Sequence, residues 1–215
     1  MPCRPVIFGR YFYFKECKMQ NKSLSKTILV GLFTAISLIL FLLEFPIIPG
    51  NSALKLDFSD IPPLVGAVLF GPFFGVAVEA LKNILELIFK GLGTQMGFGN
   101  LMNFIVGVAY IVPFALFYKA LNKNERIRGL AASYIAGAVA TACIVLAGLG
   151  ANYVIAPLFF KYFLNQEIPK SVLWTFIGSA SILNAVKGLL LTVCAYPLSS
   201  VLKKQVKISA MYALK

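Results

Sequence analysis

Two polar residues interrupt a long apolar segment near the C-terminal end of the sequence. Asn184 and Lys187 lie three positions apart within residues 171–202, a stretch that contains no acidic residue. In a helix, this spacing places both side chains on one face. A lysine near the bilayer centre costs at least about 2.5–3.5 kcal/mol on insertion scales. We therefore expect Lys187 to face a partner on another helix, a ligand or a wet cavity.

A second buried amide accompanies this pair in the preceding apolar segment. Asn152 lies in "GLGANYVIAP", where Gly148 and Gly150 permit a close backbone approach. Counted inward at helical rise, Asn152 and Asn184 both lie about 16–20 Å from the outer ends of their segments. Two amides and an ammonium at one level offer donors and acceptors together. Such a set suits a planar heterocycle, uncharged or weakly anionic, with an acceptor–donor–acceptor edge.

Residues 72–89 carry a third set of polar groups, in which each charge has an opposite charge or an amide three or four positions away: Glu79, Lys82, Asn83 and Glu86. One interpretation is a pocket wall, in which Lys82 and Asn83 contact the ligand. The other is a self-compensated structural face, with Lys187 clamped to one of its acids across the helices. An intramembrane enzyme using these charges is a further alternative, although no nucleophile, base and orienting group stand together.

Composition places the chain in the membrane and removes many enzyme classes. Of 215 residues, 59% are hydrophobic and 13% are charged, against roughly 25% charged in soluble domains. We expect an all-α integral membrane protein with one helical domain. The absence of histidine excludes imidazole metal sites and Ser-His or Cys-His catalysis. The four cysteines show no CxxC spacing, so we interpret them as small apolar residues and expect no metal, no cofactor and no enzyme activity.

The net charge of +12 is concentrated in three clusters, which lie before the first apolar span, within residues 119–128 and in the C-terminal tail. This distribution indicates cytoplasmic loops rather than nucleic-acid binding. We expect a cytoplasmic segment at 1–24, a membrane domain at 25–203 and a cytoplasmic tail at 204–215. Residues 1–18 make a poor signal peptide, and we expect them to be an extension before a true start at Met19.

The apolar spans are separated by polar, glycine-rich or charged breaks, and they read as Thr27–Leu43, Ile61–Phe70, Pro72–Phe89, Leu101–Leu121, Leu130–Phe163 and Ser171–Leu202. A single helix over residues 60–90 would be about 46 Å long, against a hydrocarbon core of about 30 Å. A break at Gly71-Pro72 also keeps the basic clusters on one side. The sequence therefore predicts a bundle of six transmembrane helices with both termini cytoplasmic, the second helix being tilted or shielded by protein.

The longest outer connection, residues 44–59, alternates apolar residues at Leu54, Leu56 and Phe58. It is either a solvent loop or an extended or hairpin flap over an outward-facing pocket. In the second case, Leu56, Asp57 and Phe58 contact the ligand. In the first span, Gly31 and Ala35 form a small-xxx-small step that lets another helix approach closely.

The stretch "LDFSDIPPLVGAVLFGPFFGVAVEALKNILELIFKG" (56–91), with Asn152 and "NAVKG" (184–188), resembles the S components of energy-coupling factor (ECF) vitamin transporters. The resemblance covers nearly all of residues 25–203 and is greatest to the riboflavin-specific members. It implies that Asn152, Asn184 and Lys187 hydrogen-bond the isoalloxazine edge of riboflavin, and it leaves flavin mononucleotide open as a second ligand. An S component for another vitamin is the alternative.

The same resemblance implies partners in a prokaryotic cell membrane. The step at Gly31 and Ala35 would meet a transmembrane coupling subunit, and the first small residue is glycine where the family has alanine. The sequence contains no Walker A pattern. Energy for uptake would therefore come from two partner ATPase subunits, with riboflavin as the transported substrate.

Overall fold

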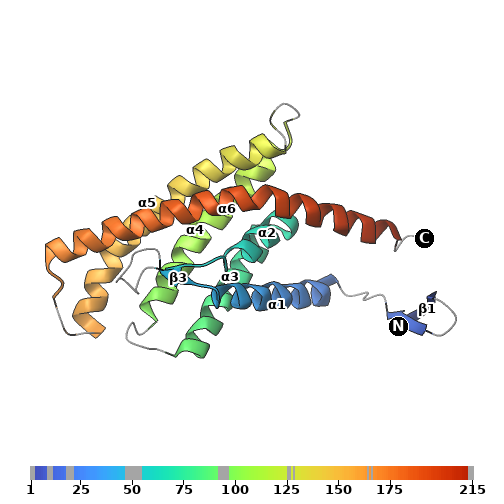
Figure 1. Ribbon diagram of the computed structural model, residues 1–215, viewed down its shortest axis with the longest axis horizontal. Coiled ribbons are helices and arrows are strands. Elements are labelled where there is room, and N and C mark those ends of the chain that lie inside the picture. Colours follow the sequence, from blue (N-terminus) through green and yellow to red (C-terminus); the bar gives the residue numbers. More distant parts are fainter. Residues whose placement is uncertain are drawn as a thin grey trace.

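The computed structural model describes residues 3–8, 12–17, 22–46, 55–91, 97–124, 127, 129–163, 165 and 167–212. Six helices make up most of this part: α1 (Lys22–Phe41), α2 (Ile61–Phe70), α3 (Pro72–Lys90), α4 (Phe98–Leu121), α5 (Leu130–Phe163) and α6 (Lys170–Tyr212) (Figure 1). The six predicted helices are confirmed. The structure adds two short antiparallel strand pairs, β1 (Cys3–Phe8) with β2 (Phe12–Cys17), and β3 (Phe45–Pro46) with β4 (Lys55–Leu56).

The first strand pair lies within the segment that we expected to be an extension, and the sequence analysis did not predict it. The second pair joins the two ends of the predicted flap, so the hairpin interpretation is correct at its base. Residues 47–54, which include Leu54, lie outside the described part of the chain.

The predicted break between the second and third helices falls at Gly71. This residue has φ 107°, a value that favours glycine, and Pro72 follows as the first residue of α3. The ten residues of α2 would extend about 15 Å. Its residues 62–67 are all buried, which confirms that the short helix is shielded by protein.

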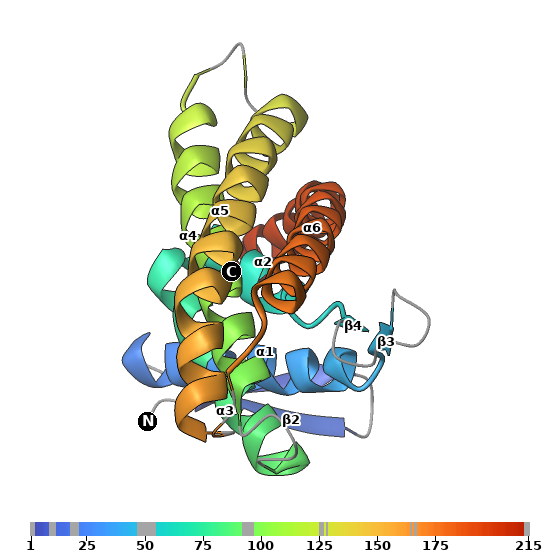
Figure 2. The ribbon, with the colours of Figure 1, turned by 90° about the vertical axis from the view of Figure 1, so that its left-hand side faces the viewer.

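Within the described part of the chain, three helices are long and apolar enough to cross a membrane: α4, α5 and the part of α6 from Lys170 to Leu198. Helix α4 packs antiparallel to α5 and α5 packs against α6 (Figure 2). Helix α2 contacts α1, α3, α4 and α6 and so joins the two halves of the bundle. The start of α1 and the end of α6 lie at the same end of the long axis in Figure 1.

The main apolar core lies between α2, α4, α5 and α6. Tyr110, Phe114 and Tyr118 stack along α4 with ring centroids 5.8 Å apart. The hydroxyl group of Tyr110 is 2.8 Å from Oγ1 of Thr192 on α6. This hydrogen bond satisfies a buried hydroxyl and fixes the height of α6 against α4.

Candidate ligand pocket

The structure brings Asn152, Asn184 and Lys187 together around one pocket. The cavity has a volume of about 140 Å³ and opens to the outside, so it is smaller than the about 300–1,000 Å³ of typical small-molecule sites. The other lining residues come from α4 and α6 and are mostly apolar: Phe98, Gly99, Met102, Asn103, Val106, Phe176 and Ala180. A few polar groups thus converge on a pocket whose other lining residues are mostly apolar.

Asn184 reaches the pocket because α5 has no side chain at position 148. A Cβ at Gly148 would overlap the amide nitrogen of Asn184. The Asn184 side chain is 7% exposed, and it makes no hydrogen bond to any residue within the described ranges. An amide in this position is a donor and acceptor group that a ligand can satisfy.

Asn152 sits one helical turn after Gly148 and is also buried. Its Nδ2 atom donates a 2.8 Å hydrogen bond to the backbone oxygen of Gly148. This bond fixes the orientation of the amide, and only one of its two N–H groups is used. Asn152 therefore presents its remaining polar atoms beside Asn184.

Lys187 is 6% exposed and has its partners in two other parts of the chain. Its Nζ atom lies 2.8 Å from Oδ2 of Asp60 and 3.8 Å from Oδ2 of Asp57, and it donates a 2.9 Å hydrogen bond to Oδ1 of Asn103. The alternative that paired Lys187 with an acid of the third helix is wrong, because its acidic partners lie in the segment before α2. The lysine is nonetheless at the pocket wall, within reach of a ligand.

A closed chain of polar contacts extends from Lys187 into the bundle. Asp60 pairs with Lys82, and Lys82 pairs with Oε1 of Glu79 at 2.7 Å. The same Glu79 oxygen accepts a 2.9 Å hydrogen bond from Asn83. Asn83 in turn accepts a 3.3 Å hydrogen bond from Asn103, which returns to Lys187.

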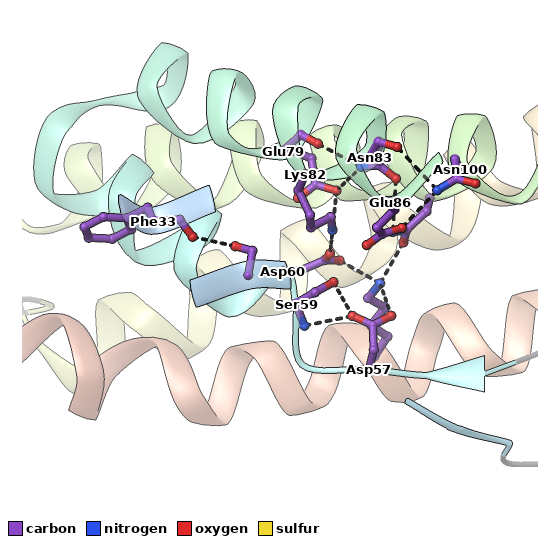
Figure 3. Close-up of polar contacts among 12 residues, drawn as sticks. Phe33, Asp57, Ser59, Asp60, Glu79, Lys82, Asn83, Glu86 and Asn100 are labelled. Carbon is purple, nitrogen blue, oxygen red and sulfur yellow. Dashed lines mark hydrogen bonds and ion pairs between the residues drawn. The ribbon is translucent and has the colours of Figure 1, made fainter. Parts of the chain in front are cut away.

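Figure 3 shows Asp60 and Lys82 pointing toward one another and Asn83 beside Glu79. Asn100 of α4 adds a 3.0 Å hydrogen bond to Glu86. Four of the eight acidic residues of the chain and two of its lysines are buried in this cluster. The cluster connects the pocket to α3 and to the segment before α2.

The other residues that we predicted to contact a ligand do not line this pocket. Lys82 is fully buried in its ion pairs and is absent from the pocket lining, and Asn83 reaches the lining only through Asn103. Leu56 and Asp57 are buried and Phe58 is half-buried. Their direct contact with a ligand stays a prediction.

The sequence analysis missed Asp60 and Asn103 as residues of the site. Asp60 precedes α2 and pairs with Lys187, whose position is 127 residues later in the chain, and no local pattern reveals that pairing. Asn103 lies with Asn100 in the first turns of an otherwise apolar helix, which is a weak signal for a buried polar contact.

Gly31 and Ala35 do not line this pocket; they lie on the exposed side of α1. A Cβ at Gly31 would meet nothing within 4 Å. Their neighbours Ile28, Leu32 and Ile36 are exposed as well. This apolar face of α1 is open among the described residues.

The fold and pocket together define a multi-pass membrane protein that binds a small molecule through a few buried polar groups. The sequence matches the family "ECF transporter, substrate-specific component" over residues 25–199. The chain belongs to this family and is a multi-pass protein of the cell membrane.

Named relatives support the assignment. The chain is 34% identical to "Riboflavin transporter FmnP" of Bacillus subtilis over 170 residues, 78% of this chain and 86% of the relative. It is 30% identical to "Riboflavin transporter RibU" of Staphylococcus aureus over 81% of this chain and 86% of the relative. A solved S component of a bacterial ECF transporter has the same fold, with a TM-score of 0.64, 24% identity, and coverage of 86% of this chain and 99% of that one.

Proposed function

We propose that this chain is the riboflavin-binding subunit of an ECF importer. The observation that carries the proposal is the nearly buried, unpartnered amide of Asn184 beside Lys187 in an otherwise apolar pocket. The names of the relatives, which are riboflavin transporters, support riboflavin as the ligand.

The polar groups match one edge of an isoalloxazine ring. Asn184 and Asn152 would donate to and accept from the pyrimidine edge, and Lys187 would donate to a flavin carbonyl or ring nitrogen. The apolar side chains Phe98 and Phe176 line the same pocket, where they would cover the ring faces. A lysine is kept at this depth because the ligand, like Asp60, supplies acceptors for it.

The proposed topology has six crossings with residues 1–24 and 204–215 in the cytoplasm. The basic clusters support this orientation, and so does the position of the start of α1 and the end of α6 at one end of the molecule (Figure 1). Cysteine labelling from outside intact cells tests it: a cysteine at Lys170 should react, and one at Lys123 should not.

Uptake requires partners in this proposal. The open face at Gly31 and Ala35 would meet the transmembrane coupling subunit, and two ATPase subunits would supply the energy. Flavin mononucleotide is the second ligand to compare, and an S component for another vitamin is the alternative function.

The deciding experiment is a titration of the detergent-purified full chain with riboflavin, followed by quenching of flavin fluorescence. Thiamine and biotin serve as matched vitamin controls, and flavin mononucleotide is titrated in parallel. We expect saturable quenching by riboflavin at one site per chain. Binding of another vitamin without riboflavin binding would overturn the proposal.

A further inference from the structure

A second pocket lies at the other end of α4 and shares no residue with the Asn184 pocket. It has a cavity volume of about 500 Å³ and lies between the α2–α3 break and the last turn of α4. Its lining residues are Ala67, Val68, Leu69, Phe70, Gly71, Pro72, Ala115, Tyr118, Lys119, Asn122 and Lys123. We call this site the basic groove.

The polar groups of the basic groove favour an anion. Lys119 and Lys123 line it, and neither has an ion-pair partner within the part of the chain that the structure describes. Asn122 accepts a 2.7 Å hydrogen bond from the backbone N–H of Gly129 through Oδ1, which leaves its amide N–H groups to donate. None of the lining residues is acidic.

The start of α3 adds to this positive character. Gly71 and Pro72 form part of the lining; Gly71 precedes α3, a helix of 19 residues, and Pro72 is its first residue. The N-terminal end of a helix carries a partial positive charge. A Cβ at Gly71 would meet nothing within 4 Å, so the groove is open at this point.

The apolar residues of the groove indicate what kind of anion would bind. The last residues of α2 are half-buried and line the groove together with Ala115 of α4. An ion such as free phosphate has no use for such a surface, whereas the acyl chains of a phospholipid would cover it. Basic pockets between helices at the cytoplasmic side are suited to anionic lipid headgroups.

We propose that the basic groove binds an anionic phospholipid. Lys119, Lys123 and the Asn122 amide contact the headgroup phosphate, and the acyl chains lie along the end of α2. Because the groove is separate from the Asn184 pocket, this proposal does not depend on the identity of the transported ligand.

The test uses the full chain, delipidated in detergent, and native mass spectrometry with phosphatidylglycerol or phosphatidylcholine of the same acyl chains. We expect one phosphatidylglycerol to be retained at concentrations at which phosphatidylcholine is not. The double variant Lys119→Gln/Lys123→Gln should weaken this binding about tenfold or more, since each basic residue near the surface contributes about 1 kcal/mol. Lys119→Arg/Lys123→Arg should retain it.

The matched control is Lys161→Gln/Lys170→Gln, which removes the same charge from exposed positions at the other end of α5 and α6. Lipid binding should be unchanged in this variant, and thermal unfolding and vitamin binding should be unchanged in both. Equal loss in the control, equal retention of the two lipids, or displacement by inorganic phosphate at the lipid concentration would overturn the proposal. The proposal would also be overturned if no lipid were retained. If Lys119 and Lys123 were then protected from amine labelling only in the complex with the coupling subunit, the basic groove would be a protein interface instead.

Discussion

Glycines on α5 and α6 and a glycine on α1 differ in how closely other helices pack against them. In α5 and α6, a Cβ at Gly148 or Gly137 would overlap Asn184 or Thr192 of the facing helix, and one at Gly188 would lie 2.7 Å from Oγ1 of Thr141 on α5. On α1, a Cβ at Gly31 would meet nothing. Gly137, Gly148 and Gly188 are thus already used for packing within the subunit.

The difference indicates which face is available to a partner. Lipid is as apolar as a leucine side chain, so helices associate in membranes through close packing and polar contacts. In α5–α6 the close approach delivers Asn184 to the pocket. On α1 the same small-residue step remains open, and close packing there requires another chain. The following variants test this contrast, from the largest to the smallest expected effect on riboflavin binding.

Lys187→Met should have the largest effect. Removing the charge of an unpaired buried lysine would stabilise a protein. Lys187, however, neutralises Asp60 and lies near Asp57. Breaking a buried ion pair costs about 3–5 kcal/mol, and losing a charge-assisted hydrogen bond to the ligand costs about 1.5–3 kcal/mol. Thermal unfolding and a riboflavin titration should show both losses, whereas Lys161→Met should show neither. Unchanged affinity in the folded variant would remove Lys187 from the site.

Gly148→Ala should weaken riboflavin binding by up to about tenfold, because the new methyl group displaces the Asn184 amide and a lost hydrogen bond costs up to about 1.5 kcal/mol. Gly150→Ala is the matched control, two positions away in the same helix with nothing within 4 Å of its Cβ. It should leave binding unchanged and raise helix stability slightly. Equal affinities for the two variants would contradict the role given to Asn184.

Asp57→Asn should have a smaller effect, chiefly on the rate of ligand release. Oδ1 of Asp57 accepts a 2.7 Å hydrogen bond from the backbone N–H of Ser59, and Oδ2 faces Lys187. Asparagine keeps an acceptor but removes the charge that holds the base of the flap to α6. Stopped-flow dissociation should be about fivefold faster, corresponding to about 1 kcal/mol. The exposed Glu167→Gln is the control, and equal release rates would separate the flap from ligand retention.

Gly31→Leu with Ala35→Leu should have the smallest effect on riboflavin binding and should abolish uptake. Both positions are exposed and Gly31 faces open space, so the isolated subunit should bind riboflavin normally. The bulky side chains would prevent a coupling helix from approaching, and ATP-dependent uptake with the partners should be lost. Gly178→Leu, also in open space on α6, should affect neither measurement. Normal uptake by the α1 variant would place the coupling interface elsewhere.

Much of the fold could be predicted because the relevant signals are local. Apolar length, the Gly71-Pro72 pair and the basic clusters are all contiguous in sequence, and the predicted bounds of α2 and α5 agree with the structure. Helix α6 continues ten residues beyond its predicted end at Leu202, to Tyr212. Asn152, Asn184 and Lys187 could be predicted to face a pocket or a partner, because a polar side chain in an apolar helix has a large energetic cost that polar contacts must offset.

The partners of these residues were decided only by tertiary structure. Whether Lys187 meets α3 or the segment before α2 depends on the rotation and height of α6, which a sequence period does not specify. Asn103 and Asp60 become part of the site only because α4 and α2 pack against α6 at that level. Sequence by itself determined which buried groups require partners, and packing determined which partners they have, because pairing depends on distances between helices that no local pattern encodes.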